Sequence, residues 1–126
     1  MQLLLITLLM AAGYLGYVFI ARLLQNRYLK KLSQDEFIKG YRKAQLIDVR
    51  EEKEYNGGHI LGARNIPMSQ LRMRYREIRK DKPVYLYCAG SVRSRQAARF
   101  LKRKGYSDLH YLDGGFRKWT GKIKKK

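Results

Sequence analysis

Cysteine and histidine are scarce in this 126-residue chain, which holds one cysteine and two histidines. A single cysteine excludes an intramolecular disulfide, and it is typical of a reducing compartment, where a thiol stays free for chemistry. The cysteine and the histidines also lack the spacing of metal ligands, so we expect no structural zinc site. The sequence accordingly predicts neither a metal nor a cofactor.

Acidic residues are also few, and none of the ten lies before Asp35. The first 32 residues carry four cations without compensating charge, and the remainder holds 24 basic against 10 acidic side chains. A surface with formal net charge +18 attracts nucleic acid, anionic lipid or small anionic substrates. Because no nucleic-acid-binding module is recognisable, nucleic acid is the partner that we expect least.

Charged side chains are absent from residues 3–21. As a helix these 19 residues would be about 28 Å long, close to the hydrocarbon core of a bilayer at about 30 Å. A cleaved signal peptide is the alternative, but its basic n-region is missing and the apolar run exceeds the usual length. The cations follow the apolar run, so the positive-inside rule predicts a single-pass anchor over residues 1–24 in the cell membrane, with the remaining chain in the cytoplasm.

A basic segment follows the apolar run. Residues 22–32 alternate cations with leucines and predict a helix that continues along the membrane surface. Cations beside a cytoplasmic leaflet contribute about 1 kcal/mol each where anionic lipid is present. We therefore expect residues 25–32 to be a basic juxtamembrane linker that holds the following domain close to the bilayer.

Helical and strand patterns alternate after this linker. A capping box from Ser33 to Glu36 begins a helix that runs to about Arg42. Alternation of strands with helices is typical of a parallel sheet covered on both faces. The predicted domain spans residues 33–121 and leaves a frayed basic tail over 122–126. Strands are predicted over 45–49, 84–87 and 109–112, and helices over 51–54, 68–78 and 94–104.

One stretch, residues 84–94, combines the features of a reactive cysteine site. An apolar, β-prone run leads to Cys88, a loop with Gly90 follows, and a helical pattern begins at Ser94. Amides of such a loop and helix N-terminus point at one spot, where the helix dipole adds positive potential. The alternative is that a lone cysteine after an apolar strand is only a small buried hydrophobe. The addition of Arg93 favours a nucleophile, because a nearby guanidinium lowers a thiol pKa.

The soluble part of the chain resembles a single-domain rhodanese, a sulfurtransferase module. Four stretches carry the resemblance in the family's order: LIDVR (46–50), EYNGGHILGARNIP (54–67), YLYCAGSVRS (85–94) and YLDGGFRKW (111–119). The resemblance implies a central parallel sheet flanked by helices. It also implies that Cys88 accepts the outer sulfur of a small anionic donor, such as thiosulfate or a persulfide, and passes it to a thiol or cyanide acceptor.

The resemblance also implies roles for residues around Cys88. Arg93 would steer the anionic donor, and Gly114 and Gly115 would approach the loop closely and cap the site. Asp48 would either orient the loop or, more commonly, hold neighbouring turns together. The active loop would consist of Ala89, Gly90, Ser91, Val92, Arg93 and Ser94.

Other polar residues of these stretches have structural interpretations. We expect Arg50 and Glu54 to pair as surface charges. His59 lies in a glycine-rich setting, and we expect it to act as a structural hydrogen-bonding group rather than as a general base.

The active loop departs from the family's common order, Cys-x-Ser-Gly-x-Arg-Ser, because serine and glycine are exchanged. If the third residue after the cysteine needs a positive φ, Ser91 adopts it at a cost of about 1 kcal/mol, where glycine would incur none. The loop has four residues between Cys88 and Arg93. Related cysteine phosphatases have one more, so the loop size favours sulfur over phosphate.

The first interpretation is therefore a membrane-anchored cytoplasmic sulfurtransferase that works through a Cys88 persulfide. The alternative is a catalytically weak rhodanese-like module that binds a partner, carries sulfur or senses redox state, and the exchanged Ser91 keeps this alternative open. A phosphatase or arsenate reductase would require the longer loop and a general-acid aspartate beside it.

Overall fold

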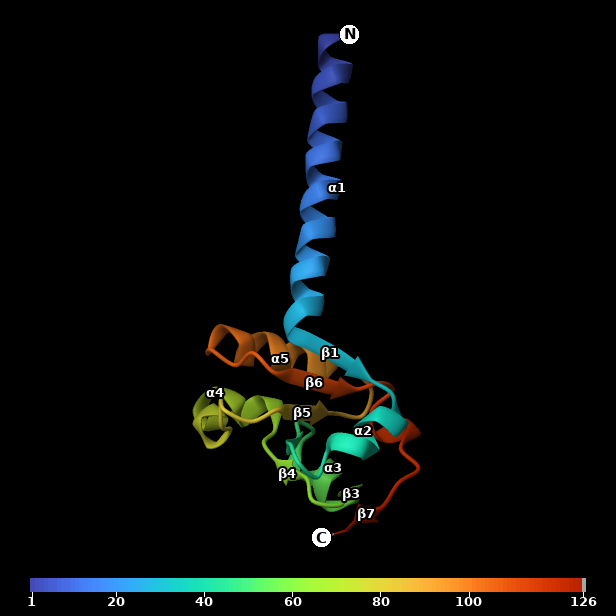
Figure 1. Ribbon diagram of the computed structural model, residues 1–126, viewed down its shortest axis with the longest axis vertical. Helices are drawn as coiled ribbons and strands as arrows, with labels where there is room; N and C mark the ends of the chain where they lie inside the picture. The colour runs from blue at the N-terminus through green and yellow to red at the C-terminus, as the bar shows by residue number, and fades with distance from the viewer. Residues whose placement is uncertain (126) are drawn as a thin grey trace.

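The computed structural model describes residues 1–125, apart from the side chains of residues 25–28. Its longest element is helix α1 (Gln2–Tyr28), which projects away from the rest of the chain (Figure 1). The segment Gln2–Leu24 has a mean hydropathy of 2.2, and none of it is buried. By length and composition this helix is able to cross a membrane, although signal sequences share both properties.

A five-stranded parallel sheet forms the centre of the remaining chain. Its interior strands are short apolar runs, as expected for parallel strands that are buried on both faces. This sheet confirms the predicted fold class. In spatial order the strands are β1 (Leu29–Leu32), β6 (Leu109–Leu112), β5 (Val84–Tyr87), β2 (Gln45–Asp48) and β4 (Arg64–Asn65).

Helices cover both faces of the sheet (Figure 1). On one face, α5 (Val92–Arg103) and α4 (Leu71–Arg74) contribute to the larger core cluster. On the other face, α2 (Gln34–Gly40) and α3 (Glu52–Asn56) pack with a second, more aromatic cluster. The sheet is therefore sandwiched between two apolar layers, which is the arrangement that the alternating pattern predicts.

Side chains of β5 alternate between these two layers. Val84, Leu86 and Cys88 belong to the α5 layer, whereas Tyr85 and Tyr87 belong to the α2 layer. Successive side chains of a strand point to opposite faces, so Cys88 continues the inward row of β5. The cysteine is thereby placed under α5 at the carboxyl end of a central strand.

The sheet begins earlier than the sequence predicts. The predicted helix over residues 22–32 is wrong for its last four residues, because residues 29–32 form β1 and pair in parallel with β6. Leu29 is buried, and Leu32 O accepts a hydrogen bond from Asp113 N at 2.8 Å. The linker prediction is therefore wrong for residues 29–32, and the side chains of residues 25–28 lie outside the described residues.

The predicted helix over 68–78 is divided into three turns. The 3₁₀ turns η1 (Met68–Gln70) and η2 (Tyr75–Glu77) flank α4. Gln70 and Arg74 have φ values of −111° and −113°, well outside the usual helical range, and they separate the turns. The spacing of apolar residues predicts which side of this segment is buried. It does not predict where the helical hydrogen bonds are interrupted.

The C-terminal segment returns to the body of the protein. Strand β7 (Ile123–Lys124) pairs antiparallel with β3 (His59–Ile60), and Leu61 N donates to Lys122 O at 3.2 Å. The predicted frayed tail over 122–126 is therefore wrong for residues 122–124. Lys126 lies outside the described residues.

Candidate active site

Cys88 lies directly after β5, and its side chain is only 1% exposed. The chain turns through three residues and enters α5 at Val92. The sulfur is therefore held between the carboxyl end of a central strand and the N-terminus of a 12-residue helix. In parallel sheets, ligands bind at this edge, where the helix N-terminus favours negative charge.

Helix α5 begins two residues earlier than predicted. Val92, Arg93 and Ser94 form its first turn, and amides of a first turn have no partner within the helix. Ser94 is fully buried, and its Oγ has no hydrogen-bond partner among the described residues. The helix start therefore offers several donors close to the loop that carries Cys88.

The exchange of serine and glycine does not strain the active loop. Ser91 has φ −128° and ψ −14°, and no described residue other than glycine has a positive φ. A Cβ at Gly90 would meet nothing within 4 Å. The cost of about 1 kcal/mol that the sequence predicts for a positive φ at Ser91 therefore does not arise.

Glycines after β6 lie directly against the active loop. A Cβ at Gly115 would come within 3.0 Å of the backbone oxygens of Cys88, Ala89 and Gly90. Beyond it, Phe116 N donates to Cys88 O at 2.8 Å and Arg117 N donates to Ala89 O at 3.1 Å. This close approach requires a residue without a side chain and fixes the carbonyls of the loop.

Gly114 makes a second contact with the loop. Its amide donates to Ser91 Oγ at 3.3 Å, so the side chain of Ser91 is used across the loop and makes no bond to the helix that follows it. Gly114 and Gly115 both have positive φ values, of 76° and 63°. The structure thus brings both glycines into contact with the active loop.

Arg93 forms a two-pronged ion pair with Glu54 of α3. Its two terminal nitrogens lie 2.9 and 3.1 Å from the two carboxylate oxygens. The hydrogen bond from Arg93 is the main cause that lowers the pKa of Glu54 below its usual range. The same hydrogen bond is the main cause that raises the pKa of Arg93. The guanidinium of Arg93 is therefore engaged by Glu54 at the start of α5.

The predicted pairing of Arg50 with Glu54 is wrong. Arg50 is 4% exposed and binds the fully buried carboxylate of Asp48, with the shortest nitrogen–oxygen distance at 2.8 Å. It also donates to Gly58 O at 2.6 Å, and its guanidinium lies 4.2 Å from the centre of the Phe116 ring. Asp48 thus ties the end of β2 to the turn after α3, which is the second of its two predicted roles.

Comparison with protein-family models assigns the chain to a family. The Rhodanese-like domain matches residues 26–122. This chain belongs to the rhodanese family. The match begins before residue 33, in agreement with the inclusion of β1 in the sheet of the rhodanese-like domain.

Individual relatives range from a full-length match to matches over the domain. The uncharacterized protein YqhL of Bacillus subtilis is 56% identical over 121 residues, 96% of each chain. Thiosulfate sulfurtransferase GlpE of Shewanella oneidensis is 35% identical, over 60% of this chain and 74% of its own. The putative sulfur carrier protein YrkF of B. subtilis is 33% identical, over 75% of this chain and 48% of its own. The family thus includes both a named enzyme and a named carrier.

Solved structures show the same fold. A rhodanese-related protein from Thermoplasma volcanium superposes with a TM-score of 0.71 at 26% identity, over 77% of this chain and 99% of that protein.

His59 of this rhodanese has a structural position. Its Nδ1 lies 2.9 Å from Tyr55 O, and its ring stacks on the Tyr55 ring at 3.7 Å between centroids. The side chain is buried beside β7 rather than in the loop of Cys88. This placement agrees with a hydrogen-bonding role.

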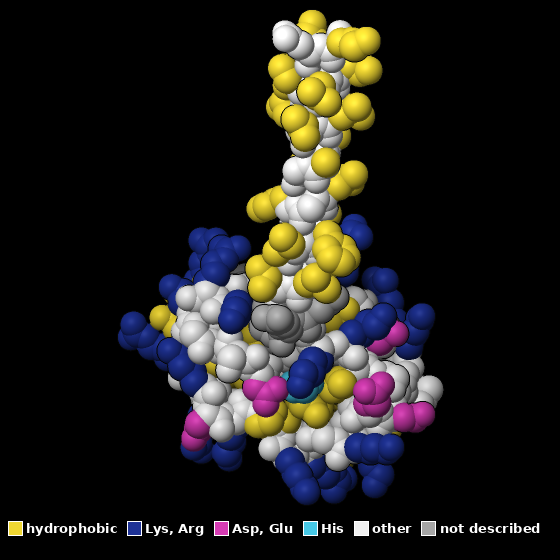
Figure 2. Space-filling view, turned by 45° about the horizontal axis from the view of Figure 1, so that its top comes forward, with side chains coloured by type: hydrophobic (Ala, Val, Ile, Leu, Met, Phe, Trp, Pro, Cys, Tyr) yellow, Lys and Arg dark blue, Asp and Glu magenta, His cyan; other side chains and the backbone are white. Residues whose placement is uncertain are grey.

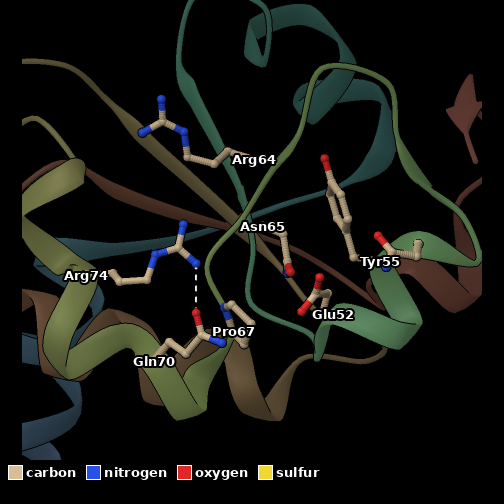
Figure 3. Close-up of a pocket in the computed structure, with 8 residues that line it drawn as sticks. Glu52, Tyr55, Arg64, Asn65, Pro67, Gln70 and Arg74 are labelled. Carbon is tan, nitrogen blue, oxygen red and sulfur yellow. Dashed lines mark hydrogen bonds between the residues drawn. The ribbon is translucent and has the colours of Figure 1, made fainter. Parts of the chain in front are cut away.

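A polar pocket of about 290 Å³ lies between α3 and the segment from β4 to α4 of the rhodanese-like domain (Figure 3). Arg74 donates to Gln70 Oε1 there at 2.9 Å, and Asn65 binds the backbone oxygens of Asp48 and Arg50. No residue of the active loop lines this pocket. Within the part of the chain that the structure describes, no cluster of His, Cys, Asp or Glu fits a metal ion.

The residue that the sequence did not connect with the site is Glu54. It lies 39 positions before Arg93, and only the fold brings α3 to the first turn of α5. Its one sequence signal is that it stands in the second stretch that resembles the family, next to Tyr55.

Proposed function

We propose that this rhodanese moves a sulfane sulfur from thiosulfate or a persulfide donor to a thiol or cyanide acceptor through a persulfide on Cys88. The observation that carries the proposal is the position of Cys88 between the end of β5 and the N-terminus of α5. Anionic sulfur is stabilised there by amides and by the helix dipole. The relative GlpE, named as a thiosulfate sulfurtransferase, supports the same chemistry.

The reaction proceeds in two displacements at sulfur. The Cys88 thiolate attacks the outer sulfur of thiosulfate, a new sulfur–sulfur bond forms, and the old one breaks as sulfite leaves with its electron pair. An acceptor thiolate or cyanide then attacks the terminal sulfur of the persulfide, and Cys88 leaves as a thiolate. Neither step needs a proton transfer to the donor, so the proposal requires no general acid. Ser94 Oγ, which is buried and has no hydrogen-bond partner among the described residues, is a candidate donor to the charged sulfur.

Arg93 is the residue that we propose for recognition of the anionic donor. Its guanidinium presents a planar fork suited to an oxyanion such as thiosulfate. In the structure this fork is occupied by Glu54. An anionic donor therefore competes with the Glu54 carboxylate for Arg93, and when the donor binds, the carboxylate is released.

We further propose that α1 anchors the protein in the cell membrane with the rhodanese-like domain on the cytoplasmic side. Figure 2 shows hydrophobic side chains along α1 and Lys and Arg side chains over the visible face of the domain below it. Arg22, Lys30 and Lys31 follow the apolar segment, and cations are enriched on the cytoplasmic side. The basic flank would then contact anionic lipid.

Intact mass spectrometry of the full chain in neutral detergent tests the chemistry. We expect the chain to gain one sulfur atom on incubation with thiosulfate and to lose it again with cyanide. Cys88→Ser removes only the sulfur that receives the adduct, so this variant should gain nothing. An unchanged mass of the wild-type chain with every donor, or an adduct that persists in Cys88→Ser, would overturn the proposal.

A sulfur carrier without efficient turnover is the second candidate. It is favoured by the 1% exposure of Cys88, by the occupied guanidinium of Arg93, and by the relative YrkF, named as a putative sulfur carrier. Both candidates form the persulfide. A steady thiosulfate:cyanide turnover in the full chain supports the enzyme, whereas a single sulfur transfer per chain supports the carrier.

A further inference from the structure

A second, separate pocket lies where α5 ends. It has a volume of about 340 Å³ and is lined by Arg72, Phe100, Arg103 and Lys104, which we call the α5 basic pocket. Arg72 comes from α4, and the other three come from the last turn of α5 and its C-cap. Three of the four lining side chains are cations, and no acidic side chain lines the pocket.

Phe100 of the α5 basic pocket belongs to a packed aromatic group. The rings of Tyr75 and Phe100 meet edge to face, 5.6 Å apart, and both pack against the larger core cluster. Tyr106 donates from its hydroxyl to Tyr75 O and Ile78 O, at 2.8 and 2.6 Å. Lys104 Nζ lies 5.3 Å from the centre of the Tyr75 ring and 5.6 Å from that of Phe100, within the range of a cation–π contact.

The cations of the α5 basic pocket are not neutralised. Among the described residues, no carboxylate forms an ion pair with Arg72, Arg103 or Lys104. The acidic residues of the preceding segment are already used, because Glu77 binds Arg74 and Asp81 binds Arg79.

Two further cations strengthen the field at the pocket. Arg76 lies 5.9 Å from the centre of the Tyr75 ring, and Lys80 Nζ would lie 3.1 Å from a Cβ on Gly105, next to Lys104. Arg76, followed by Lys104 and Lys80, lowers the pKa of the Tyr75 hydroxyl. The pocket therefore combines one aromatic ring with three lining cations and two cations close by, and no acidic side chain lines it.

The α5 basic pocket is distinct from the active site. Cys88 lies before the first turn of α5, whereas the pocket lies at its last turn. Twelve residues of helix separate the two ends by about 17 Å. A ligand in the pocket therefore does not touch the Cys88 loop.

We propose that the α5 basic pocket binds a phosphate group, carried either by the headgroup of an anionic phospholipid or by a free phosphate. Guanidinium groups bind phosphate oxygens through paired hydrogen bonds, and a lysine adds a compact charge. Arg72 and Arg103 approach from two elements, so a phosphate between them replaces their mutual repulsion with two ion pairs.

Nuclear magnetic resonance of the full chain in a neutral detergent tests this proposal. The ¹⁵N-labelled chain is titrated separately with inorganic phosphate and with short-chain phosphatidylglycerol, and short-chain phosphatidylcholine serves as the zwitterionic control. We expect saturable shifts of the Phe100 and Arg103 amides that weaken as salt is raised. Saturation by both anionic probes supports a free-phosphate site, and saturation by phosphatidylglycerol alone supports a lipid-headgroup site.

A matched pair of variants separates the pocket from general basicity. Arg72→Gln/Lys104→Gln removes two charges from the pocket, and Lys39→Gln/Arg42→Gln removes the same two from the exposed surface around α2. We expect the first variant to bind the anionic probe about tenfold more weakly and the second to bind like the wild type. The Leu86 amide in the sheet reports whether each variant is folded. An absence of saturation with both anionic probes, or equal weakening in the two variants, would overturn the proposal.

Discussion

Gly115→Ala is the substitution whose effect is best determined by the structure. The added Cβ would lie within 3.0 Å of three backbone oxygens of the active loop. Backbone oxygens cannot rotate away as a side chain does, so the segment after β6 must separate from the loop. The substitution therefore separates the segment after β6 from the loop of Cys88, and it changes no side chain that the proposed reaction uses.

The magnitude follows from two contributions. At φ 63° and ψ −157°, Gly115 occupies a region that is nearly exclusive to glycine, and an alanine there costs about 1–3 kcal/mol. Separation from the loop also removes the hydrogen bonds from Phe116 N to Cys88 O and from Arg117 N to Ala89 O, at about 1 kcal/mol each. The free energy of unfolding should therefore fall by about 3–5 kcal/mol.

Gly62→Ala is the matched control. Gly62 also has a positive φ, of 92°, but a Cβ there would meet nothing within 4 Å. Both variants place an alanine at a positive φ, and only Gly115→Ala meets the active loop, so we expect it to lose about 2 kcal/mol more. Urea unfolding of the full chain in neutral detergent measures both values through the fluorescence of Trp119, the single tryptophan.

Persulfide formation gives the second readout. With thiosulfate we expect Gly115→Ala to form the Cys88 adduct about tenfold more slowly, because its loop carbonyls and amides are displaced. Gly62→Ala should react at the wild-type rate. If both variants lost equal stability, or if Gly115→Ala reacted normally, the claim that this glycine shapes the loop would be refuted.

Two further predictions concern Glu54 and the first strand. Arg93 lowers the pKa of Glu54 in the folded chain. The ionised Glu54 therefore contributes fully to stability above the pKa of about 4.5 in the unfolded chain, and this contribution is lost as the pH falls through the lower pKa of the folded chain. Urea midpoints should therefore fall more steeply below pH 4.5 in the wild type than in Glu54→Gln. Glu54→Gln should also lower the KM for thiosulfate, since Arg93 becomes free, and an unchanged KM would contradict the proposed competition. A chain that starts at residue 33 should unfold more easily, by about 2–4 kcal/mol, than one that starts at residue 29, because it lacks β1 and its backbone hydrogen bonds to β6; equal urea midpoints would show that β1 is dispensable.

The fold class and the place of Cys88 were predictable because both depend on local patterns. Apolar runs such as 84–87 alternate with amphipathic segments such as 94–104, and this order specifies a parallel sheet covered by helices. The reactive loop follows from the same logic, since a cysteine after a central strand necessarily meets the next helix N-terminus. The comparison with rhodaneses confirms the family and the fold, and the role of Cys88 remains a prediction for mass spectrometry.

The errors concern contacts between distant segments. Strand β1 has the sequence Leu-Lys-Lys-Leu, which shows no alternation, and it becomes a strand only because β6 offers a free edge. The sequence predicts that Arg50 and Glu54 pair, yet the buried Asp48 binds Arg50 and the fold brings Arg93 to Glu54. Pairings of this kind depend on tertiary geometry, which a single sequence does not encode in any local pattern.

Strand β1 begins at the residue after the last residue of α1. If α1 is inserted in a bilayer, no loop residues separate this helix from the first strand of the domain, and the loop of Cys88 stays close to the lipid. Strand β1 leads away from α1, and all strands of the parallel sheet end at the same edge, so Cys88 lies at the edge toward which β1 runs. If the proposed function holds as well, a sulfur donor or acceptor would have to reach the loop of Cys88 close to the membrane surface.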